Sequence, residues 1–289
     1  MLTRRLLSST RIAQQVWAIR LLSTEPAPLT VDRLTGKDQG IVLFRLNRPQ
    51  TKNAVSKLLL ERLHQEADAL AVDPAARVLI LKSDVPGAFC SGADLKERKG
   101  MPQEEVGPLV KRIRAFADKL EDLPMPTIAA LDGFALGGGL EFALSCDIRV
   151  ASTTAKMGLT ETKLAIIPGA GGCQRLPRLI GSSKAKELIF TGSILDGKEA
   201  HSIGLVNTVT EGGPEAAYER ALEMAREIVM RGPIAVRLSK LAIDTSMRAD
   251  AEVASKMEEQ CYAHIVTTKD RVEGLRAFVE KRPPVYKGE

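Results

Sequence analysis

Three short apolar runs, separated by segments with helical periodicity, constrain the fold of this chain more than any other feature. The runs are VLILK at 78–82, TIAAL at 127–131 and DIRVA at 147–151. Near-continuous apolar runs of this length are typical of strands that are buried on both faces. Because parallel strands need long crossover connections, the alternation predicts an α/β fold in which crossover helices cover a parallel sheet.

The segments around these runs extend the prediction. LTVDRLT (29–35) and IVLFRLN (41–47) flank a turn and predict a hairpin. Ser56 can cap a helix that reaches Leu70, and a second helical pattern stops before Pro124. The first of these helices should bury one apolar face, made of Leu59, Leu60, Leu63, Ala67 and Leu70. We expect residues 83–94 to form a loop.

The strand signal ends at Pro214, and the rest of the chain is helical in pattern. The expected helices cover 215–231, 234–246, 249–265 and 269–280. A chain of 289 residues has room for one large domain with a helical appendage. We therefore predict an α/β core followed by a helical C-terminal part.

Composition excludes several classes of protein. Charged residues make up 27% and hydrophobic residues 44% of the chain, which argues against disorder. No apolar run approaches the roughly 20 residues that a membrane-spanning helix needs. The four cysteines are dispersed without a CxxC pair and there are three histidines, so neither a disulfide framework nor a structural zinc site is expected. Aromatic residues make up 4%, too few for the stacking platforms of single-stranded nucleic-acid binding.

The first 24 residues differ from the remainder in charge. They contain four arginines and no acid, and their apolar residues gather on one side of a helical projection. An amphipathic cationic segment of this kind predicts a mitochondrial transit peptide, with a disordered tail as the alternative. Taking those four arginines from the 41 basic residues leaves 37 against 36 acids. The net charge of +5 is therefore no evidence for a nucleic-acid surface.

Two glycine-rich loops follow buried runs and expose backbone. They are FCSGADLKE (89–97) and DGFALGGGLEFAL (132–144). The second places Gly137, Gly138 and Gly139 at the start of an apolar helical run, where free N–H groups can stabilise negative charge on an oxygen. A tight turn or close helix packing explains the glycines equally well.

Two acids stand near such loops. Glu141 lies among apolar residues, so it is either a solvent-facing residue of an amphipathic helix or a buried acid; burial would raise its pKa. Glu161 begins ETKLAIIPGAGG, beside another glycine-rich turn. Together they could supply an acid–base pair, or hold a water between them. No Walker loop or dinucleotide fingerprint competes with this interpretation.

The long motifs resemble the enoyl-CoA hydratase/isomerase (crotonase) superfamily. FCSGADLKE, PTIAALDGFALGGGLEFALSCDIRVA, MGLTETKLAIIPGAGGCQRLPRLIG and EGLRAFVEKRPPVYKGE carry the resemblance, which covers the chain after about residue 30. It implies a crotonase-like spiral of ββα units with a C-terminal helical trimerisation region. The chain then divides into a transit peptide (1–24), a crotonase core (25–214) and a C-terminal helical region (215–289). A homotrimer or dimer of trimers in the mitochondrial matrix is implied.

The same resemblance implies roles for individual residues. The backbone N–H groups of Ala93 and Gly138 should hold the thioester carbonyl of an acyl-CoA. Glu141 should activate the water that attacks Cβ, while Glu161 supplies a proton to Cα. The residues expected to bind CoA or substrate are Ala93, Asp94, Leu95, Lys96 and Gly138, with Tyr262 and Lys281 reaching over from a neighbouring subunit. No metal and no cofactor beyond the CoA of the substrate is implied.

Retention of both acids favours hydration of a 2-enoyl-CoA. The alternatives are an isomerase of the same fold, a catalytically silent thioester-binding protein and an AU-rich RNA-binding protein. The segment 56–77 carries more acids than bases, so RNA binding is not expected. The acyl group is left open between 3-methylglutaconyl-CoA of leucine degradation and a short-chain enoyl-CoA of fatty-acid β-oxidation. A dicarboxylate would need a cation, for which Lys163 and Arg175 are candidates.

Overall fold

A computed structural model describes residues 27–289, and its larger sheet confirms the predicted α/β core. The strand order is β1 (Leu29–Arg33), β2 (Ile41–Leu46), β3 (Val78–Ser83), β5 (Thr127–Leu131), β7 (Ile148–Ser152) and β10 (Thr208–Thr210). The β1–β2 pair is antiparallel, as the predicted hairpin requires, and every other neighbouring pair in this sheet is parallel.

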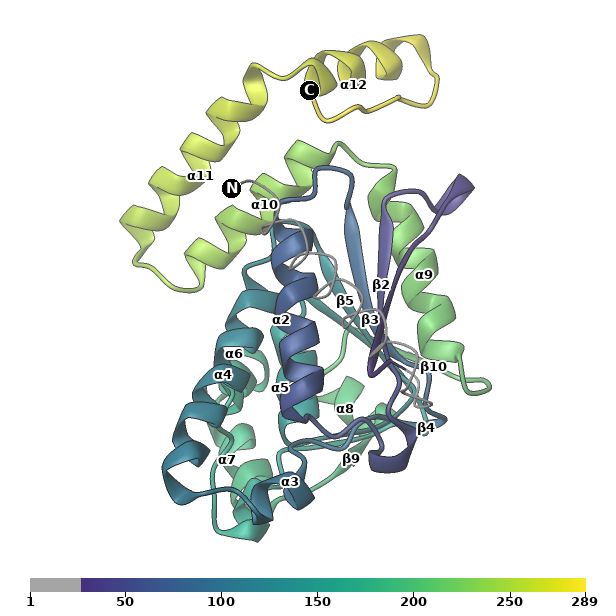
Figure 1. The fold of residues 1–289 in the computed structure, drawn as a ribbon. Helices are drawn as coiled ribbons and strands as arrows, with labels where there is room; N and C mark the ends of the chain where they lie inside the picture. Colours follow the sequence, from purple (N-terminus) through teal and green to yellow (C-terminus); the bar gives the residue numbers. More distant parts are fainter. Residues whose placement is uncertain (1–26) are drawn as a thin grey trace, which may run out of the picture.

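Helices cover both faces of this sheet (Figure 1). On one face, alternate strand residues such as Ile41 and Ile80 pack against α9 (Ala216–Val229). This helix presents the alanines Ala217, Ala221 and Ala225, whose small side chains allow close approach to the strands. The opposite face joins the main core, where α2 (Lys57–Ala71), α4 (Gln103–Glu121) and α5 (Gly138–Ser145) pack. Burial on both faces explains why the strands are apolar throughout.

The predicted helix caps are confirmed. The hydroxyl of Ser56 accepts a hydrogen bond from the N–H of Leu59 and begins α2. The face of α2 that is buried consists of the five apolar residues expected from its periodicity. Helix α4 ends at Glu121, before Pro124, because proline cannot continue the hydrogen-bonding pattern.

A second, smaller sheet was not anticipated, and the prediction that residues 83–94 form a loop is wrong. Its order is β4 (Gly87–Cys90), β6 (Gly133–Leu136), β8 (Lys156–Gly158) and β9 (Leu195–Asp196). Strand β4 forms because its backbone pairs in parallel with β6, while Phe89 is fully buried. The remaining elements of the core are α3 (Leu95–Lys99), α6 (Gly172–Ile180), α7 (Ser182–Thr191) and α8 (Gly197–Ser202), with 3-10 turns η1 (Gly36–Asp38), η2 (Pro49–Thr51) and η3 (Glu161–Leu164).

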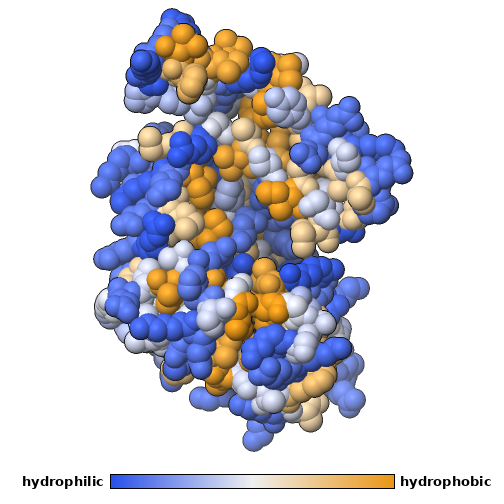
Figure 2. Space-filling view, turned by 180° about the vertical axis from the view of Figure 1, so that it is seen from behind, coloured by the Kyte–Doolittle hydropathy of each residue, from blue (hydrophilic) through white to orange (hydrophobic). Residues whose placement is uncertain are grey.

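The C-terminal part is helical, as predicted. It continues from α9 into α10 (Pro233–Ser246), α11 (Ala251–Val266) and α12 (Lys269–Glu280). Helix α11 runs back over α10, and α12 projects beyond the body of the molecule (Figure 1). Apolar side chains gather on these outer helices at the top of Figure 2. Exposed large apolar residues of α12 are Val272, Leu275, Phe278 and Val279.

Two sequence predictions concern segments rather than single elements. The transit peptide at 1–24 lies outside the described residues, and the division into 25–214 and 215–289 stays a prediction. Among the helices of residues 27–289, none combines the length and apolar character that crossing a bilayer requires.

Candidate active site

The two glycine-rich loops and the segment after β8 enclose one cavity of about 610 Å³. The first loop joins β4 to α3, the second joins β6 to α5, and the third segment includes η3. The cavity lining contains five residues expected at the site, which are Ala93, Leu95, Gly138, Glu141 and Glu161. The predicted convergence of the loops and the two acids is therefore present in the structure.

The first loop leaves the N–H of Ala93 free. An isolated parallel bridge joins Ala93 to Val55, and it uses the N–H of Asp94 and the carbonyl of Gly92. The N–H of Ala93 points away from that bridge and donates no hydrogen bond within residues 27–289. Ala93 lines the cavity, so its N–H is available to a ligand there.

The second loop fits against the first only because it is built from glycine. A Cβ atom on Gly139 would lie 2.3 Å from the carbonyl oxygen of Cys90, and Gly137 has a φ of 50°. Gly138 is the first residue of α5, where an N–H has no partner in the helix. A Cβ atom on Gly138 would lie 3.9 Å from the N of Ala93. The two amides are therefore neighbours, and the functional interpretation of the glycines is supported over a simple turn.

Glu141 is a buried acid, which resolves the alternative left open by its sequence. It lies on α5 with an exposed fraction of 3%. Its Oε1 accepts hydrogen bonds from the N–H groups of Ala170 at 2.7 Å and Gly172 at 2.8 Å. Its Oε2 accepts none within the described chain and lies 3.9 Å from the position that a Cβ of Gly138 would occupy. Burial raises the pKa of Glu141, while the two N–H donors oppose that rise.

Glu161 reaches the same place from the first residue of η3. Its Oε1 lies 3.1 Å from the position that a Cβ of Gly137 would occupy. Its Oε2 is buried without a hydrogen-bond partner among residues 27–289. Burial, and after it the negative charge of Glu141, raise the pKa of Glu161 to about 7. Burial thus raises the pKa of both carboxyl groups, and the two backbone donors on Glu141 favour its carboxylate form.

The expected CoA loop divides into buried and exposed parts. Asp94 is buried, caps α3 by accepting from the N–H of Glu97, and pairs with Arg48 at 3.3 Å. It therefore braces the loop, as expected from the sequence. Leu95 is exposed and lines the cavity, and Lys96 is exposed on the next turn position.

Tyr262 and Lys281 do not reach this cavity within one chain. Tyr262 lies on α11 with an exposed fraction of 69%, and Lys281 ends α12. These helices are at the opposite end of the molecule from α3 (Figure 1). Their contribution from a neighbouring subunit stays a prediction.

The cations proposed from sequence for a dicarboxylate are wrong in position. Lys163 packs its methylene groups against Gly192, and Arg175 is turned toward α4; neither lines the cavity. The structure instead places Arg98 and Arg114 in the lining. Sequence reasoning missed them because both lie on helices that carry no glycine motif. The buried Nε of Arg98 has no hydrogen-bond partner within the described residues.

The RNA-binding alternative has little support in the structure. The bases on α2 are paired, Lys57 with Glu105 at 2.8 Å and Arg62 with Glu66 at 2.7 Å. Such pairing removes the positive stripe that phosphate binding needs. Among residues 27–289, no group of three or more His, Cys, Asp or Glu side chains could hold a metal ion.

Comparison with known proteins gives a consistent result. A family profile described as enoyl-CoA hydratase/isomerase matches residues 36–289. The mitochondrial methylglutaconyl-CoA hydratase of Mus musculus is 56% identical over 90% of this chain and 84% of its own length. The mitochondrial enoyl-CoA hydratase domain-containing protein 2 of Homo sapiens is 50% identical over 90% of each chain.

Solved structures agree with the sequence comparison. The crystal structure of an enoyl-CoA hydratase from Bacillus anthracis matches with a TM-score of 0.87 and 48% identity, covering 91% of this chain and all of that one. A second enoyl-CoA hydratase, from Geobacillus kaustophilus, matches with a TM-score of 0.85 and 34% identity. The overall architecture, including the C-terminal helices, is therefore the one that the sequence motifs predicted.

Proposed function

Because the chain belongs to the enoyl-CoA hydratase/isomerase family and is an enoyl-CoA hydratase, we propose that Glu141 and Glu161 together add water to a 2-enoyl-CoA. The observation that carries this proposal is a pair of carboxyl groups in one cavity with unequal surroundings: Glu141 accepts two backbone hydrogen bonds, and Glu161 has a buried oxygen without a partner among residues 27–289. The backbone N–H groups of Ala93 and Gly138, which donate no hydrogen bond within the same residues, stand beside them. An isomerase needs only one proton carrier, so the second acid favours hydration.

The thioester carbonyl binds to the N–H groups of Ala93 and Gly138. As the water oxygen bonds to Cβ, the electron pair of the Cα=Cβ bond moves toward this carbonyl oxygen and gives it enolate character. Donors of this kind contribute about 3 kcal/mol each to transition-state stabilisation. Their effect is greatest when the charge is largest, so they lower the barrier rather than only tightening binding.

The two acids move the protons. The ionised Glu141 takes one proton from the water through Oε2, while the hydroxyl oxygen bonds to Cβ. Glu161 gives its proton to Cα as the enolate collapses. Glu141 then holds the proton taken from the water and Glu161 is ionised, and proton transfer from Glu141 to Glu161 through the next water restores the starting state. Because the protons are shared within a coupled pair, the pair and not either acid alone sets the pH dependence.

This mechanism is tested with Glu141→Gln and Glu161→Gln. Each change keeps the volume of the side chain and removes a proton carrier, so we expect hydration of crotonyl-CoA to fall by about 10²–10⁴-fold. Glu187→Gln, an exposed residue of α7, serves as the control and should keep full activity. Turnover in either active-site variant equal to wild type would remove that acid from the mechanism.

For the acyl group we propose a branched dicarboxylate such as 3-methylglutaconyl-CoA. Relatives at 56% identity are named methylglutaconyl-CoA hydratase, and Arg98 lines the cavity with an unpartnered, buried Nε. A carboxylate at the far end of the acyl group would give that guanidinium a partner. A simple short-chain enoyl-CoA would leave it unpaired.

The substrate proposal is tested by comparing kcat/KM for 3-methylglutaconyl-CoA and crotonyl-CoA. Wild type should prefer the dicarboxylate, and Arg98→Gln should reduce kcat/KM for it at least tenfold while changing crotonyl-CoA less than threefold. Lys99→Gln, an exposed neighbour on α3, is the matched control. Preference for crotonyl-CoA, or equal losses on both substrates, would contradict the proposal.

We further propose that the protein is a homotrimer, or a dimer of trimers, in the mitochondrial matrix. The exposed apolar side chains of α12 and the distance of Tyr262 and Lys281 from their own cavity support contact with another copy. Light scattering should give three or six times the mass of one chain. Phe278→Asp should reduce that mass, whereas Val72→Asp, at an exposed apolar residue just after α2, should not. The mitochondrial names of the relatives and the cationic residues 1–24 support the location.

A further inference from the structure

The turn at residues 169–172 holds Glu141 in place, but it is short and glycine-rich, so other residues must hold the turn itself in position. Its N–H groups at Ala170 and Gly172 both point at one oxygen of Glu141. Gly169, Gly171 and Gly172 have no side chains to anchor the segment, and Gly171 has a φ of 106°. A glycine-rich turn pays more conformational entropy to be ordered than other segments do. The precision of the two donors therefore depends on contacts made by the carbonyl groups.

Arg114 makes one such contact, because its Nε donates to the carbonyl of Gly169 at 2.8 Å, and Arg175 makes others from the far side of the turn. Its Nη1 donates to the carbonyl of Ala170 at 2.9 Å, and its backbone N–H donates to the carbonyl of Gly171 at 2.9 Å. A Cβ atom on Gly171 would lie only 2.0 Å from the same Nη1. The guanidinium is thus packed directly against the turn, and its residue is 6% exposed.

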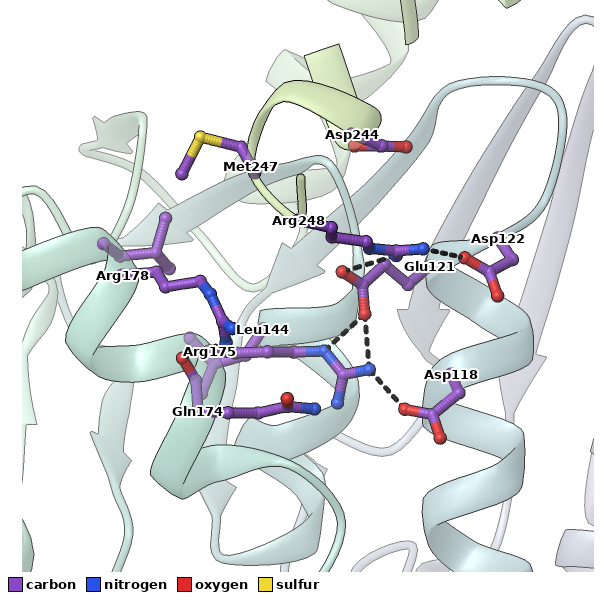
Figure 3. Close-up of a pocket in the computed structure, with 11 residues that line it drawn as sticks. Asp118, Glu121, Asp122, Leu144, Gln174, Arg175, Arg178, Asp244, Met247 and Arg248 are labelled. Atoms are coloured by element: carbon purple, nitrogen blue, oxygen red, sulfur yellow. Dashed lines mark hydrogen bonds and ion pairs between the residues drawn. The ribbon is translucent and has the colours of Figure 1, made fainter. Parts of the chain in front are cut away.

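The guanidinium is itself held by helix α4. Its Nε donates to Glu121 at 2.8 Å, and its Nη2 donates to Asp118 at 2.7 Å (Figure 3). Arg248, at the end of α10, also pairs with Glu121, at 2.9 Å. Figure 3 shows these side chains converging from α4, α6 and the C-terminal region. They line a hollow that shares no lining residue with the substrate cavity. The planar guanidinium group of Arg175 has several donors in a fixed arrangement and can hydrogen-bond to all these partners at once, which the ammonium group of a lysine cannot do.

We propose that Arg175 is a positioning residue for hydration, which holds the Ala170 carbonyl so that two amides fix one oxygen of Glu141 and leave the other free for water. The inference rests on the proposed role of Glu141. Arg175 does not line the substrate cavity, so it acts through the turn and not by touching the substrate.

The charges around Glu141 determine the sign of the expected pH effect. Arg175 on α6 and Arg114 on α4 both lower the pKa of Glu141, as the two amides do. Glu161 on η3 is the acid close enough for the charge of Glu141 to raise its pKa. Removing Arg175 takes away a cation and loosens two donors. Both changes raise the pKa of Glu141, so the acidic limb of kcat moves to higher pH.

The experiment compares Arg175→Met, Arg175→Lys and the control Arg178→Met. Arg178 is exposed on the same helix and donates to Gln174 of that helix. We expect Arg175→Met to lower kcat at least tenfold, with KM within threefold of wild type and the acidic limb raised by about one pH unit. Arg175→Lys keeps the charge without the forked guanidinium. Its acidic limb should therefore lie between those of Arg175→Met and wild type, and its kcat should be less than half that of wild type. Arg178→Met should match wild type.

Glu121→Gln provides a second variant if Arg175→Met does not fold. It keeps the size of the side chain and weakens the anchor of the guanidinium but leaves its charge, so a smaller displacement of the limb in the same direction is expected, with a smaller loss of kcat. Folded variants in which kcat and KM change together without movement of the acidic limb would overturn the inference. If Glu141→Gln abolishes hydration while the Arg175 variants match Arg178→Met, this inference fails and the proposed function stands. If Glu141→Gln retains full activity, the proposed function fails first.

Discussion

Replacing Glu161 by Gln should stabilise the protein above pH 7 while it removes activity. Burial and the charge of Glu141 raise the pKa of Glu161 from 4.5 to about 7 in the folded state. The folded protein therefore keeps a proton that the unfolded chain releases at lower pH. The stability that comes from this proton is complete below pH 4.5 and is lost as pH rises through 7. A glutamine carries no charge and does not suffer that loss.

The size of the effect follows from the two pKa values. Each pKa unit corresponds to about 1.36 kcal/mol, so the rise from 4.5 to about 7 sets an upper value near ~3 kcal/mol. Glu161 is partly accessible to solvent from the cavity, which screens its charge. We therefore expect Glu161→Gln to gain about 1–2 kcal/mol of unfolding free energy between pH 5 and pH 8.5, relative to wild type.

Urea unfolding at pH 5 and pH 8.5 measures this gain. Glu187→Gln changes an exposed acid that pairs with Lys184 on the same helix, and its effect should stay within about 0.5 kcal/mol at both pH values. If Glu161→Gln were no more stable than wild type at pH 8.5, the carboxyl group would not be the desolvated acid described above. Loss of activity with no gain in stability would point to a disturbed site.

Three further predictions concern the pH profile, the loop contact and a helix cap. The kcat for hydration should fall about tenfold per pH unit above 7 as the coupled pair loses the proton that Glu161 holds; initial rates from pH 6 to 9 that stay flat would contradict this. Gly139→Ala should cost more than about 3 kcal/mol in urea unfolding, since its Cβ would lie 2.3 Å from the Cys90 carbonyl, whereas Gly100→Ala has open space and should cost less than about 1 kcal/mol. Ser56→Ala should cost about 1 kcal/mol by removing the cap of α2, measured in the same way; no loss would mean that the cap is replaced by water.

The larger sheet could be predicted from sequence because its strands are buried on both faces. Runs such as 78–82 and 127–131 stay apolar for five residues, which separates them from the helical pattern around them. The buried face of α2 could be predicted as well, since its five buried apolar residues recur at helical spacing. Both predictions rest on periodicity within a single segment.

The smaller sheet could not be predicted in the same way. Strands β4 and β6 have four residues each, begin with glycine and lie in segments that also contain turn residues. What makes them strands is their pairing with each other across about 45 residues of chain. Such pairing is a tertiary contact and leaves no periodic signal in a run of four residues.

At the site too, residues within local motifs could be predicted from sequence, whereas residues placed by tertiary packing could not. The sequence indicated two acids and two backbone amides for the site, and the structure brings Glu141, Glu161, Ala93 and Gly138 to one cavity. It could not indicate which cations face that cavity, because the position of Arg98 depends on how α3 packs under the first loop. The direction in which Arg175 points was hidden for the same reason.

In the proposed mechanism, the unequal surroundings of the two acids set the order of proton transfer. Glu141 has one oxygen fixed by two N–H groups of a turn, and two carbonyl groups of that turn are held by arginines: Ala170 by Arg175 and Gly169 by Arg114. Such support favours the carboxylate and hence the base. Glu161 has a buried oxygen without a partner, which favours the protonated acid. If the supports were exchanged, Glu161 would become the base and Glu141 would hold the proton. In the proposed mechanism, the asymmetry of the backbone donors, and not the identity of the two side chains, therefore decides which glutamate activates water.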